Sequence, residues 1–145
     1  MRVALDTNLV VSGLLWGGTP GRIIDWITER TIEAVTSEAL IQELVRILDR
    51  EKFRSKLATK NRTTGQIVAL YAQLADIVEP AVLPATIPGL LDPDDRHILA
   101  CAVAARADLI ISGDKRVRQI QTYQGIPIVS AAEALRRIEQ REPRP

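Results

Sequence analysis

Short apolar runs that end in turn-forming residues recur along this sequence. Runs of this kind, with alternating or continuous apolar positions, predict strands of a largely buried sheet. The runs that predict strands lie at 2–5, 32–36, 77–79, 108–112 and 126–129. Polar turn or cap residues follow the first of them, as Asp6-Thr7-Asn8.

Stretches with apolar residues three and four positions apart lie between these runs and predict helices. One helix is expected to begin at Pro20 with Thr19 as its cap, and another to run from a Ser37 cap to about Arg50. Further helices are predicted over 64–76, from an Asp92 cap and Pro93 to about 107, and from a Ser130 cap to about 141. The remaining pattern predicts a basic connector over 50–62 and an extended, proline-containing crossing loop over 80–88.

Strands that alternate with helices predict an α/β protein. This order requires right-handed crossover connections and gives a parallel sheet that helices cover on both faces. A length of 145 residues fits a single domain over the whole chain, residues 1–145. Because only 3% of the residues are aromatic while 46% are hydrophobic, the core is expected to consist of Leu, Ile, Val and Ala.

Cysteine usage and hydropathy indicate a cellular compartment. The one cysteine, Cys101, lies in the apolar run 98–105, where a free thiol behaves as a small hydrophobic side chain. The first strand reaches Asp6 before a signal-peptide stretch forms, and no apolar run approaches membrane-spanning length. We therefore expect a soluble, cytoplasmic protein without a membrane segment.

Two aspartates follow predicted strands directly. Asp6 and Asp114 come within two residues of the strand ends at 5 and 112. Ligands of open parallel sheets bind outside the carboxyl ends of the strands, where the strand order switches. If these two strands are neighbours, both carboxylates therefore reach the same crevice.

Two further acids lie on helices and face partly inward. At 100° per residue, Glu43 falls beside Ile47 at the edge of the apolar stripe of its helix. Asp95 shares the face of Ile98 and Leu99, which the helix is expected to bury. A carboxylate on that face is costly unless it is hydrogen-bonded or paired with positive charge.

Each acid also has a purely structural interpretation. Asp6 could end a strand, Asp95 could favour a helix dipole, Asp114 could cap a short helix, and Glu43 could be an exposed helix residue. Their neighbours are interpreted as structural or solvated, with Asp92 as a cap and Asp94 and His97 on the polar side of the helix. The combination of four acids, and not any single one, suggests a functional site.

Four converging carboxylates would repel one another, and some would take up protons, unless a cation lies between them. Oxygen ligands suit Mg²⁺ or Mn²⁺, while a single histidine, His97, excludes a multi-histidine zinc site. One or two such ions can activate water and stabilise the oxygens at phosphorus, so phosphodiester hydrolysis is the expected chemistry.

Positive charge is unevenly distributed, although the formal net charge is only +1. Residues 50–62 contain one acid, Glu51, and six basic residues, so the segment has an excess of five positive charges. The basic residues are Arg50, Lys52, Arg54, Lys56, Lys60 and Arg62. Such a segment is most often a solvated face, yet it could neutralise RNA phosphates. Lys115, Arg116 and Arg118 directly follow Asp114 and are nearer candidates, whereas the scarcity of aromatics argues against a base-stacking platform.

These residues give the sequence a resemblance to the PIN-domain nucleases, especially the VapC-like toxins of bacterial toxin-antitoxin pairs, over nearly the whole chain. Four segments in order carry the resemblance: Val3 to Asn8, Ser37 with Glu43, Asp92 to Ala100, and Ile110 to Lys115. The resemblance implies a three-layer α/β/α sandwich with a central parallel sheet that cuts RNA. It also implies a homodimer and a cognate antitoxin whose segment fills the active groove.

Carried over to this chain, the resemblance makes Asp6, Glu43, Asp95 and Asp114 the catalytic metal ligands. It also makes Asn8 and Ser112 supporting residues, whose small polar side chains orient the neighbouring ligands. Many relatives carry a further acid two residues after the last aspartate, where this sequence has Arg116, so the pattern leaves one or two metal ions open.

Three functional hypotheses follow. The first is an RNA-cleaving, Mg²⁺- or Mn²⁺-dependent enzyme. The second is a catalytically silent module of the same fold that binds RNA or protein, which would retain RNA without a metal-dependent product. The third is a phosphatase acting on small phosphoesters, which the basic segments do not favour.

Overall fold

The computed structural model describes residues 1–141 and is built around a six-stranded sheet in the order β3-β2-β1-β4-β6-β5. The strands are β1 (Arg2–Leu5), β2 (Glu33–Thr36), β3 (Ala75–Ile77), β4 (Leu109–Ile111), β5 (Thr122–Tyr123) and β6 (Ile126–Val129). All neighbouring pairs are parallel except β5 and β6, which are antiparallel. The last four residues of the predicted domain, 142–145, lie outside the described residues.

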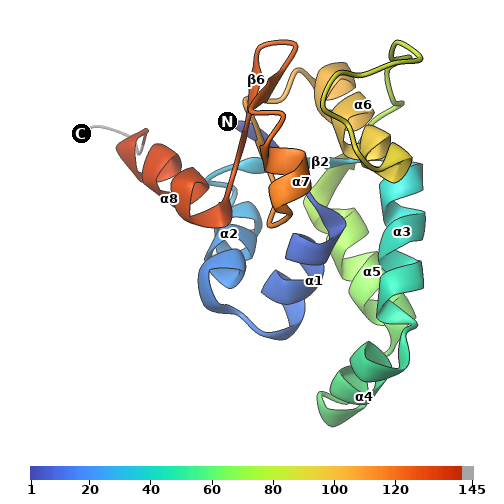
Figure 1. Cartoon of the computed structure of the whole chain (residues 1–145). Helices are drawn as coiled ribbons and strands as arrows, with labels where there is room; N and C mark the ends of the chain where they lie inside the picture. The colour runs from blue at the N-terminus through green and yellow to red at the C-terminus, as the bar shows by residue number, and fades with distance from the viewer. Residues whose placement is uncertain (142–145) are drawn as a thin grey trace.

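Helices surround the sheet (Figure 1). They are α1 (Thr7–Leu15), α2 (Gly18–Thr28), α3 (Glu38–Leu48), α4 (Glu51–Thr59), α5 (Thr64–Leu74), the 3-10 helix η1 (Pro93–Asp95), α6 (Arg96–Ala105), α7 (Lys115–Arg118) and α8 (Ala131–Gln140). Among the described residues, no helix combines the length and the apolar character needed to cross a bilayer.

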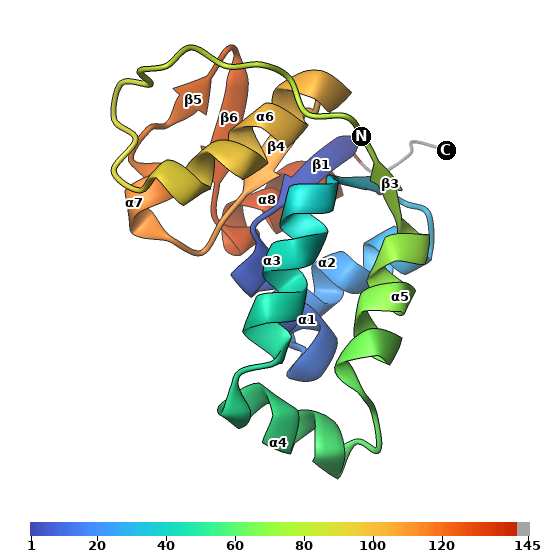
Figure 2. The ribbon, with the colours of Figure 1, turned by 90° about the vertical axis from the view of Figure 1, so that its right-hand side faces the viewer.

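Two apolar cores lie on opposite faces of the sheet, because side chains alternate along each strand. Val3 and Leu5 of β1 join a core with α1, α2, α3, α5 and α8, whereas Ala4 joins a core with α6 and the crossing loop. Figure 2 shows α6 on one side of the strands, with α1, α3 and α5 extending from the other. This is the three-layer α/β arrangement that the sequence predicts, with one antiparallel edge strand added.

Most predicted helix starts are confirmed by hydrogen bonds. Ser37 Oγ accepts from the Leu40 amide, and Ser130 Oγ accepts from the Glu133 amide. Asp92 Oδ1 accepts from the Asp94 amide at 3.0 Å and caps the 3-10 turn that leads into α6. The predicted burial of Cys101 is also confirmed, and burial raises the pKa of its thiol to about 12.

The predicted start of the second helix is wrong. Gly17, and not Thr19, is the residue before α2, and no side chain caps this end. Gly17 and Gly18 have φ of 84° and 67°, so the chain turns sharply through conformations that favour glycine. The helix therefore begins before Thr19, and Pro20 lies in its first turn.

The predicted basic connector over 50–62 is also wrong, because most of it forms helix α4. Phe53 and Leu57 lie four residues apart and are buried, which gives this charged segment an apolar side. The next helix ends at Leu74 and not at 76, and β3 lies two residues earlier than predicted. Pairing with β2 sets that strand, with Ala34 opposite Ala75 and Thr36 opposite Ile77.

Three short elements were not predicted from the sequence. Helix α1 begins immediately after Asp6, and α7 has four residues that begin after Asp114. Strand β5 has two residues and turns back through Gln124 and Gly125, both with positive φ, to pair with β6. This tight hairpin explains why the sheet is not wholly parallel.

Candidate metal-binding active site

Strands β1 and β4 place Asp6 and Asp114 at the same edge of the sheet. The two strands are adjacent and parallel, with Leu5 opposite Ile111. In the sheet, β2 and β3 lie on one side of this pair, beyond β1, and β6 and β5 lie on the other side, beyond β4. The two aspartates therefore follow the strands that flank the switch in strand order, where open α/β sheets bind ligands.

A buried serine joins the two aspartates. Ser112 is fully buried, and its hydroxyl donates to Asp6 Oδ2 at 2.7 Å. The Ser112 hydroxyl oxygen also accepts a hydrogen bond from the Asp114 amide at 3.1 Å. The other carboxylate oxygen of Asp6 accepts from the Asn8 amide at 3.2 Å, so Asp6 caps α1 while it lies at the strand edge.

The helical acids meet Asp6 from the other side of the crevice. Asp6, Glu43 and Asp95 line one narrow hollow, together with Asp94 and the buried Thr7. Glu43 and Asp95 are both partly buried, in agreement with their predicted positions beside apolar faces. Asp94, interpreted from the sequence as a residue of the polar face, is exposed yet lines the same hollow. The start of α6 in a 3-10 turn, which helical periodicity does not describe, accounts for this difference.

Burial and mutual repulsion raise the pKa of two of these carboxyl groups. For Asp95, burial is the largest cause, and the nearby Asp92, Asp114 and Asp6 add to it, which brings the pKa to about 6. For Glu43, burial again comes first, followed by the charge of Asp6. Negative charge is thus concentrated around Asp6, and a cation placed there would relieve it.

Asp114 differs from the other acids because an arginine already pairs with it. The Arg116 backbone amide donates to Asp114 Oδ1 at 2.8 Å, and its guanidinium lies 3.2 Å from Oδ2. These hydrogen bonds lower the pKa of Asp114 and keep its carboxylate charged. Arg116 therefore contacts a predicted metal ligand. In sequence, it occupies the position where the family resemblance implies a further acid in many relatives.

The donor set fits a hard divalent cation, since carboxylate oxygens converge without histidine or cysteine. The carboxylates do not stand as a ready-made shell: within residues 1–141, no three His, Cys, Asp or Glu side chains form a group that would hold a metal. Arg116 already pairs with Asp114, so this carboxylate is not free to turn toward the other acids. A cation would therefore bind only if these side chains turn toward it from their present positions.

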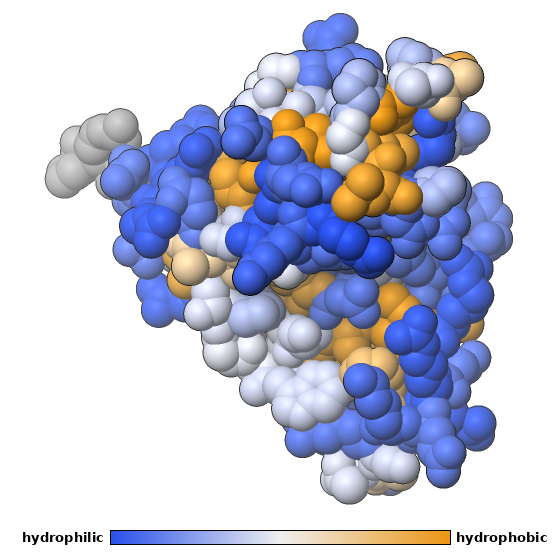
Figure 3. All heavy atoms as spheres, viewed as in Figure 1, coloured by the Kyte–Doolittle hydropathy of each residue, from blue (hydrophilic) through white to orange (hydrophobic). Residues whose placement is uncertain are grey.

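An open cleft of about 430 Å³ extends from the acids along α1. Its lining residues come from both ends of the chain: Asp6, Asn8, Leu9, Ser12, Pro20, Gly113, Asp114 and Ala131. Asn8 supports Asp6 through its backbone, and among the described residues its side chain makes no hydrogen bond. Figure 3 shows mainly hydrophilic residues on the face where α1, α3 and α7 meet, with apolar patches between them.

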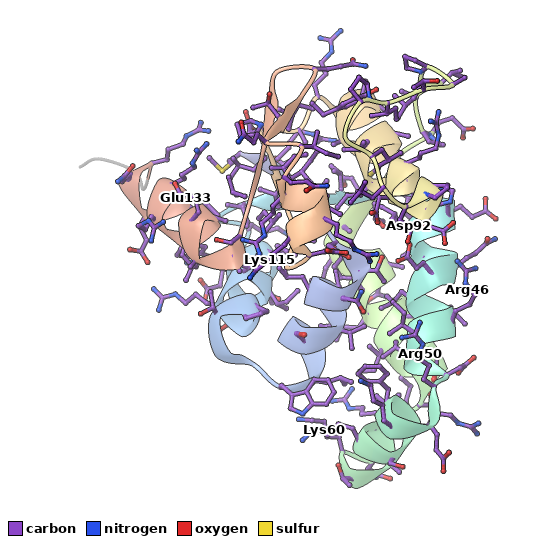
Figure 4. The ribbon with its side chains drawn as sticks, viewed as in Figure 1. Arg46, Arg50, Lys60, Asp92, Lys115 and Glu133 are labelled. Carbon is purple, nitrogen blue, oxygen red and sulfur yellow. The ribbon has the colours of Figure 1, made fainter. Side chains whose placement is uncertain are left out.

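The predicted basic residues divide into two groups. Lys115, Arg116 and Arg118 lie on α7 beside Asp114, and the Nε of Arg118 is buried without a hydrogen-bond partner among the described residues. Arg50, Lys52 and Arg54 are exposed at the far end of α3 and on α4, away from the acids. Figure 4 shows Lys115 beside the crevice and Arg50 toward α4.

Comparison with known proteins defines the family. The sequence model of the PIN domain matches residues 2–116, so this chain belongs to the PIN-domain family. PIN domains are generally nucleases, that is, hydrolases of nucleic acids, and PIN-domain nucleases typically use divalent metal ions. The family match covers all four of the acids described above.

Two individual proteins are similar to this chain. An uncharacterized protein from Methanocaldococcus jannaschii is 30% identical over 116 residues, which cover 79% of this chain and 72% of that protein. The crystal structure of VapBC2 from Rickettsia felis bound to a DNA fragment from their promoter aligns with a TM-score of 0.59. That alignment covers 90% of this chain and 98% of the other at 12% identity, and it confirms the predicted PIN-like fold.

Proposed function

We propose that this protein is an endoribonuclease that hydrolyses RNA phosphodiester bonds with Mg²⁺ or Mn²⁺. The observation that supports this most is the convergence of Glu43, Asp95 and Asp114 around Asp6 at the switch in strand order. In a chain of the PIN-domain family, such a gathering of negative charge is best explained by a cation site. The chain would act in the cytoplasm as a single catalytic domain.

The protein's own residues would prepare the site in distinct ways. Ser112 and the Asn8 amide fix both oxygens of Asp6, so this ligand needs little reorganisation. Glu43 and Asp95, which repel Asp6, would bind a cation in place of protons. A divalent ion held by these carboxylates supplies Lewis acidity to a phosphodiester and to the attacking water.

The positive charges beside the acids support a polymeric phosphodiester substrate. Lys115 is exposed on α7, and Arg46 lies one turn along α3 from Glu43. Cations on two sides of an acidic centre can neutralise phosphates on both sides of a cleaved bond. The open cleft along α1 also accommodates an extended strand better than an enclosed cavity for a small phosphoester would.

We further propose that the protein is the toxin of a toxin-antitoxin pair and acts as a homodimer. The fold it shares with VapBC2 supports this assignment, since that structure contains a toxin-antitoxin complex on promoter DNA. A cognate antitoxin would inhibit the enzyme by covering the cleft along α1. The proposal covers one or two metal ions, because Arg116 pairs with Asp114 at the position where many relatives carry a further acid.

A cleavage assay tests the proposal. Purified wild-type protein should fragment mixed RNA in the presence of Mn²⁺, and a chelator should stop it. Asp95→Asn should lose this activity and keep its fold, whereas Asp49→Asn, which changes an exposed aspartate at the end of α3, should cut normally.

Two results would contradict the proposal. RNA retention without a metal-dependent product would support a catalytically silent binding module of the same fold. Turnover of a small phosphomonoester with intact RNA would instead indicate a phosphatase.

A further inference from the structure

An exposed tryptophan at the end of α1 lies among positively charged residues of α4. Trp16 is 54% exposed, and its ring meets the edge of the Phe53 ring at a centroid distance of 5.6 Å and an angle of 69°. The ammonium group of Lys56 lies 5.7 Å from the centre of the Trp16 ring, and that of Lys52 lies 4.8 Å from the centre of the Phe53 ring. These contacts hold the indole in place while they leave much of it open to solvent.

Core packing does not account for a large aromatic residue at this position. Phe53 is 7% exposed and already closes the apolar core beneath α4. The other tryptophan, Trp26, is 6% exposed, in contrast to Trp16. A half-exposed indole on a buried aromatic base, flanked by ammonium groups, has the composition of a surface that stacks nucleobases.

A continuous helix face connects this tryptophan with the acidic centre. Asn8, Ser12 and Trp16 are four residues apart and therefore share one face of α1. Asn8 and Ser12 line the cleft that begins at Asp6. Because α1 rises 1.5 Å per residue, Trp16 lies about 15 Å from Asp6 along the helix axis. This distance equals about four nucleotides for a strand whose bases stay stacked at 3.4 Å, the rise of one strand of a DNA duplex.

Exposed cations on α3 and at the start of α4 flank the same route. Glu43, Arg46 and Arg50 are spaced by three and four residues, so the two arginines continue from the acidic side chain toward α4. Figure 4 shows Arg46 on α3, Arg50 between α3 and α4, and Lys60 at the end of α4. Figure 2 shows α4 lying across the far end of α3. Phosphates of a strand that follows α1 would thus meet arginines along one side.

We propose that Trp16 stacks on a base of single-stranded RNA about four nucleotides from the bond cleaved at Asp6. This inference rests on the proposed nuclease function and extends it with a second contact to the substrate. Stacking accepts any base, so this contact would strengthen binding to unpaired RNA without selecting a sequence. Positive charge favours RNA over a protein partner, because Lys56 lies at the Trp16 ring, Lys52 lies at the Phe53 ring, and α4 and its two ends carry three further cations, Arg50, Arg54 and Lys60.

RNA binding in the absence of cleavage tests this inference. The full chain carrying Asp95→Asn is titrated into a labelled single-stranded oligoadenylate, in chelator, and the Kd is measured by fluorescence anisotropy. Adding Trp16→Ala should weaken binding about tenfold, and Trp16→Phe should restore most of it, because phenylalanine keeps an aromatic face. Lys56→Ala should weaken binding less and reduce its salt dependence.

Two controls separate stacking from general effects. Ile77→Ala removes an apolar side chain of similar exposure, 59%, from edge strand β3 and should leave the Kd unchanged. Duplex RNA, whose bases are paired, should bind Trp16→Ala and the parent protein equally. RNA should also quench the tryptophan emission of the parent and not that of Trp16→Phe, since only the buried Trp26 then remains.

The outcomes distinguish this inference from the proposed function. If the wild type cleaves RNA but Trp16→Ala binds single strands as tightly as its parent, the stacking site is wrong while the nuclease function stands. If single-stranded RNA binds in a Trp16-dependent manner and quenches Trp16 emission but the wild type never cleaves RNA, the stacking inference stands and the proposed nuclease function fails. Absence of any RNA binding by the parent protein would overturn the stacking inference.

Discussion

The hydroxyl of Ser112 links Asp6 to Asp114, donating to the Asp6 carboxylate at 2.7 Å and accepting from the Asp114 amide at 3.1 Å. Strands β1 and β4 hold these residues in adjacent positions, although they are more than a hundred residues apart in sequence. One buried side chain therefore sets both the orientation of an acid and the direction in which the chain leaves β4.

Replacing Ser112 with alanine should weaken the cation site more than the fold. Loss of the buried Ser112 hydroxyl, which bonds both Asp6 and the Asp114 amide, is expected to lower the free energy of unfolding by about 1–3 kcal/mol. Asp6 would also lose a fixed orientation, so Mn²⁺ affinity and RNA cleavage should each fall about 10–100-fold. Calorimetric Mn²⁺ titration, chemical unfolding and cleavage rates measure the three effects.

Thr63→Ala is the control, because Thr63 also accepts a backbone hydrogen bond as the cap of α5 but lines neither the hollow nor the cleft at the acids. It should cost about 1 kcal/mol of stability and leave cleavage unchanged. Equal losses of activity in the two variants would mean that Ser112 acts only through stability.

Asp95 should make the metal-free protein less stable as the pH rises. Its pKa is raised from 3.8 to about 6 in the folded state, so between these values the folded protein binds more protons than the unfolded chain. The free energy of unfolding should therefore fall with increasing pH from about 4 to 6 and then stay low. Asp95→Asn should remove most of this fall and melt above the wild type at neutral pH in chelator.

Added Mn²⁺ should make the wild type melt above Asp95→Asn at neutral pH, because a cation favours the charged form of Asp95. Thermal melts at pH 5 and at neutral pH, with and without Mn²⁺, provide the comparison. If the melting temperatures of wild type and Asp95→Asn changed with pH in parallel, the Asp95 carboxyl would not be the source of the pH dependence.

Arg116 should compete with a metal ion for Asp114. In Arg116→Gln the cation that pairs with Asp114 is lost, so Mn²⁺ affinity should rise about two- to fivefold, the range expected for an exposed ion pair. Arg136→Gln breaks a pair with Glu133 on α8, and there Mn²⁺ affinity should not change. A lower affinity in Arg116→Gln would instead make Arg116 a support of the site.

The approach of α1 to α2 depends on a glycine. A Cβ at Gly13 would lie 2.6 Å from Ile24 Cγ1 and 2.8 Å from the Pro20 carbonyl oxygen. Because the backbone cannot move aside easily, Gly13→Ala should lower the free energy of unfolding by about 1–3 kcal/mol.

Gly21→Ala tests the same helix pair without the clash. Its nearest new contact would be 3.6 Å from the Gly13 carbonyl oxygen, an ordinary separation. Alanine also suits a helix better than glycine, so stability should stay the same or rise by up to about 1 kcal/mol. Equal destabilisation of both variants, measured by chemical unfolding, would mean that close packing at Gly13 is not the cause.

Elements with a long periodic pattern and a capping side chain could be predicted from the sequence. The Ser37 and Ser130 helices and strand β1 lie where expected, since their burial pattern and caps are local properties. Helix α4 was missed because only Phe53 and Leu57 among many charges face the core. Strand β5 was missed because its position depends on pairing with β6.

The same distinction applies to the site. Strand ends and helix phase predict Asp6, Asp114, Glu43 and Asp95, because these depend on short-range geometry. The place of Asp94 in the hollow depends on a 3-10 turn, which helical spacing does not foresee. Likewise, the approach of Trp16 to α4 depends on the tertiary packing of two helices, so composition alone gave no sign of an aromatic surface.

Direct measurement of Mn²⁺ binding tests the central claim, that Asp6 and the acids around it hold a divalent cation. Titration of wild type and Asp6→Asn at neutral pH, monitored by calorimetry and by the spin resonance of free Mn²⁺, gives both affinity and stoichiometry. We expect the wild type to bind Mn²⁺ and the folded Asp6→Asn variant to bind it at least about tenfold more weakly. Equal Mn²⁺ affinity in the two proteins would contradict the account.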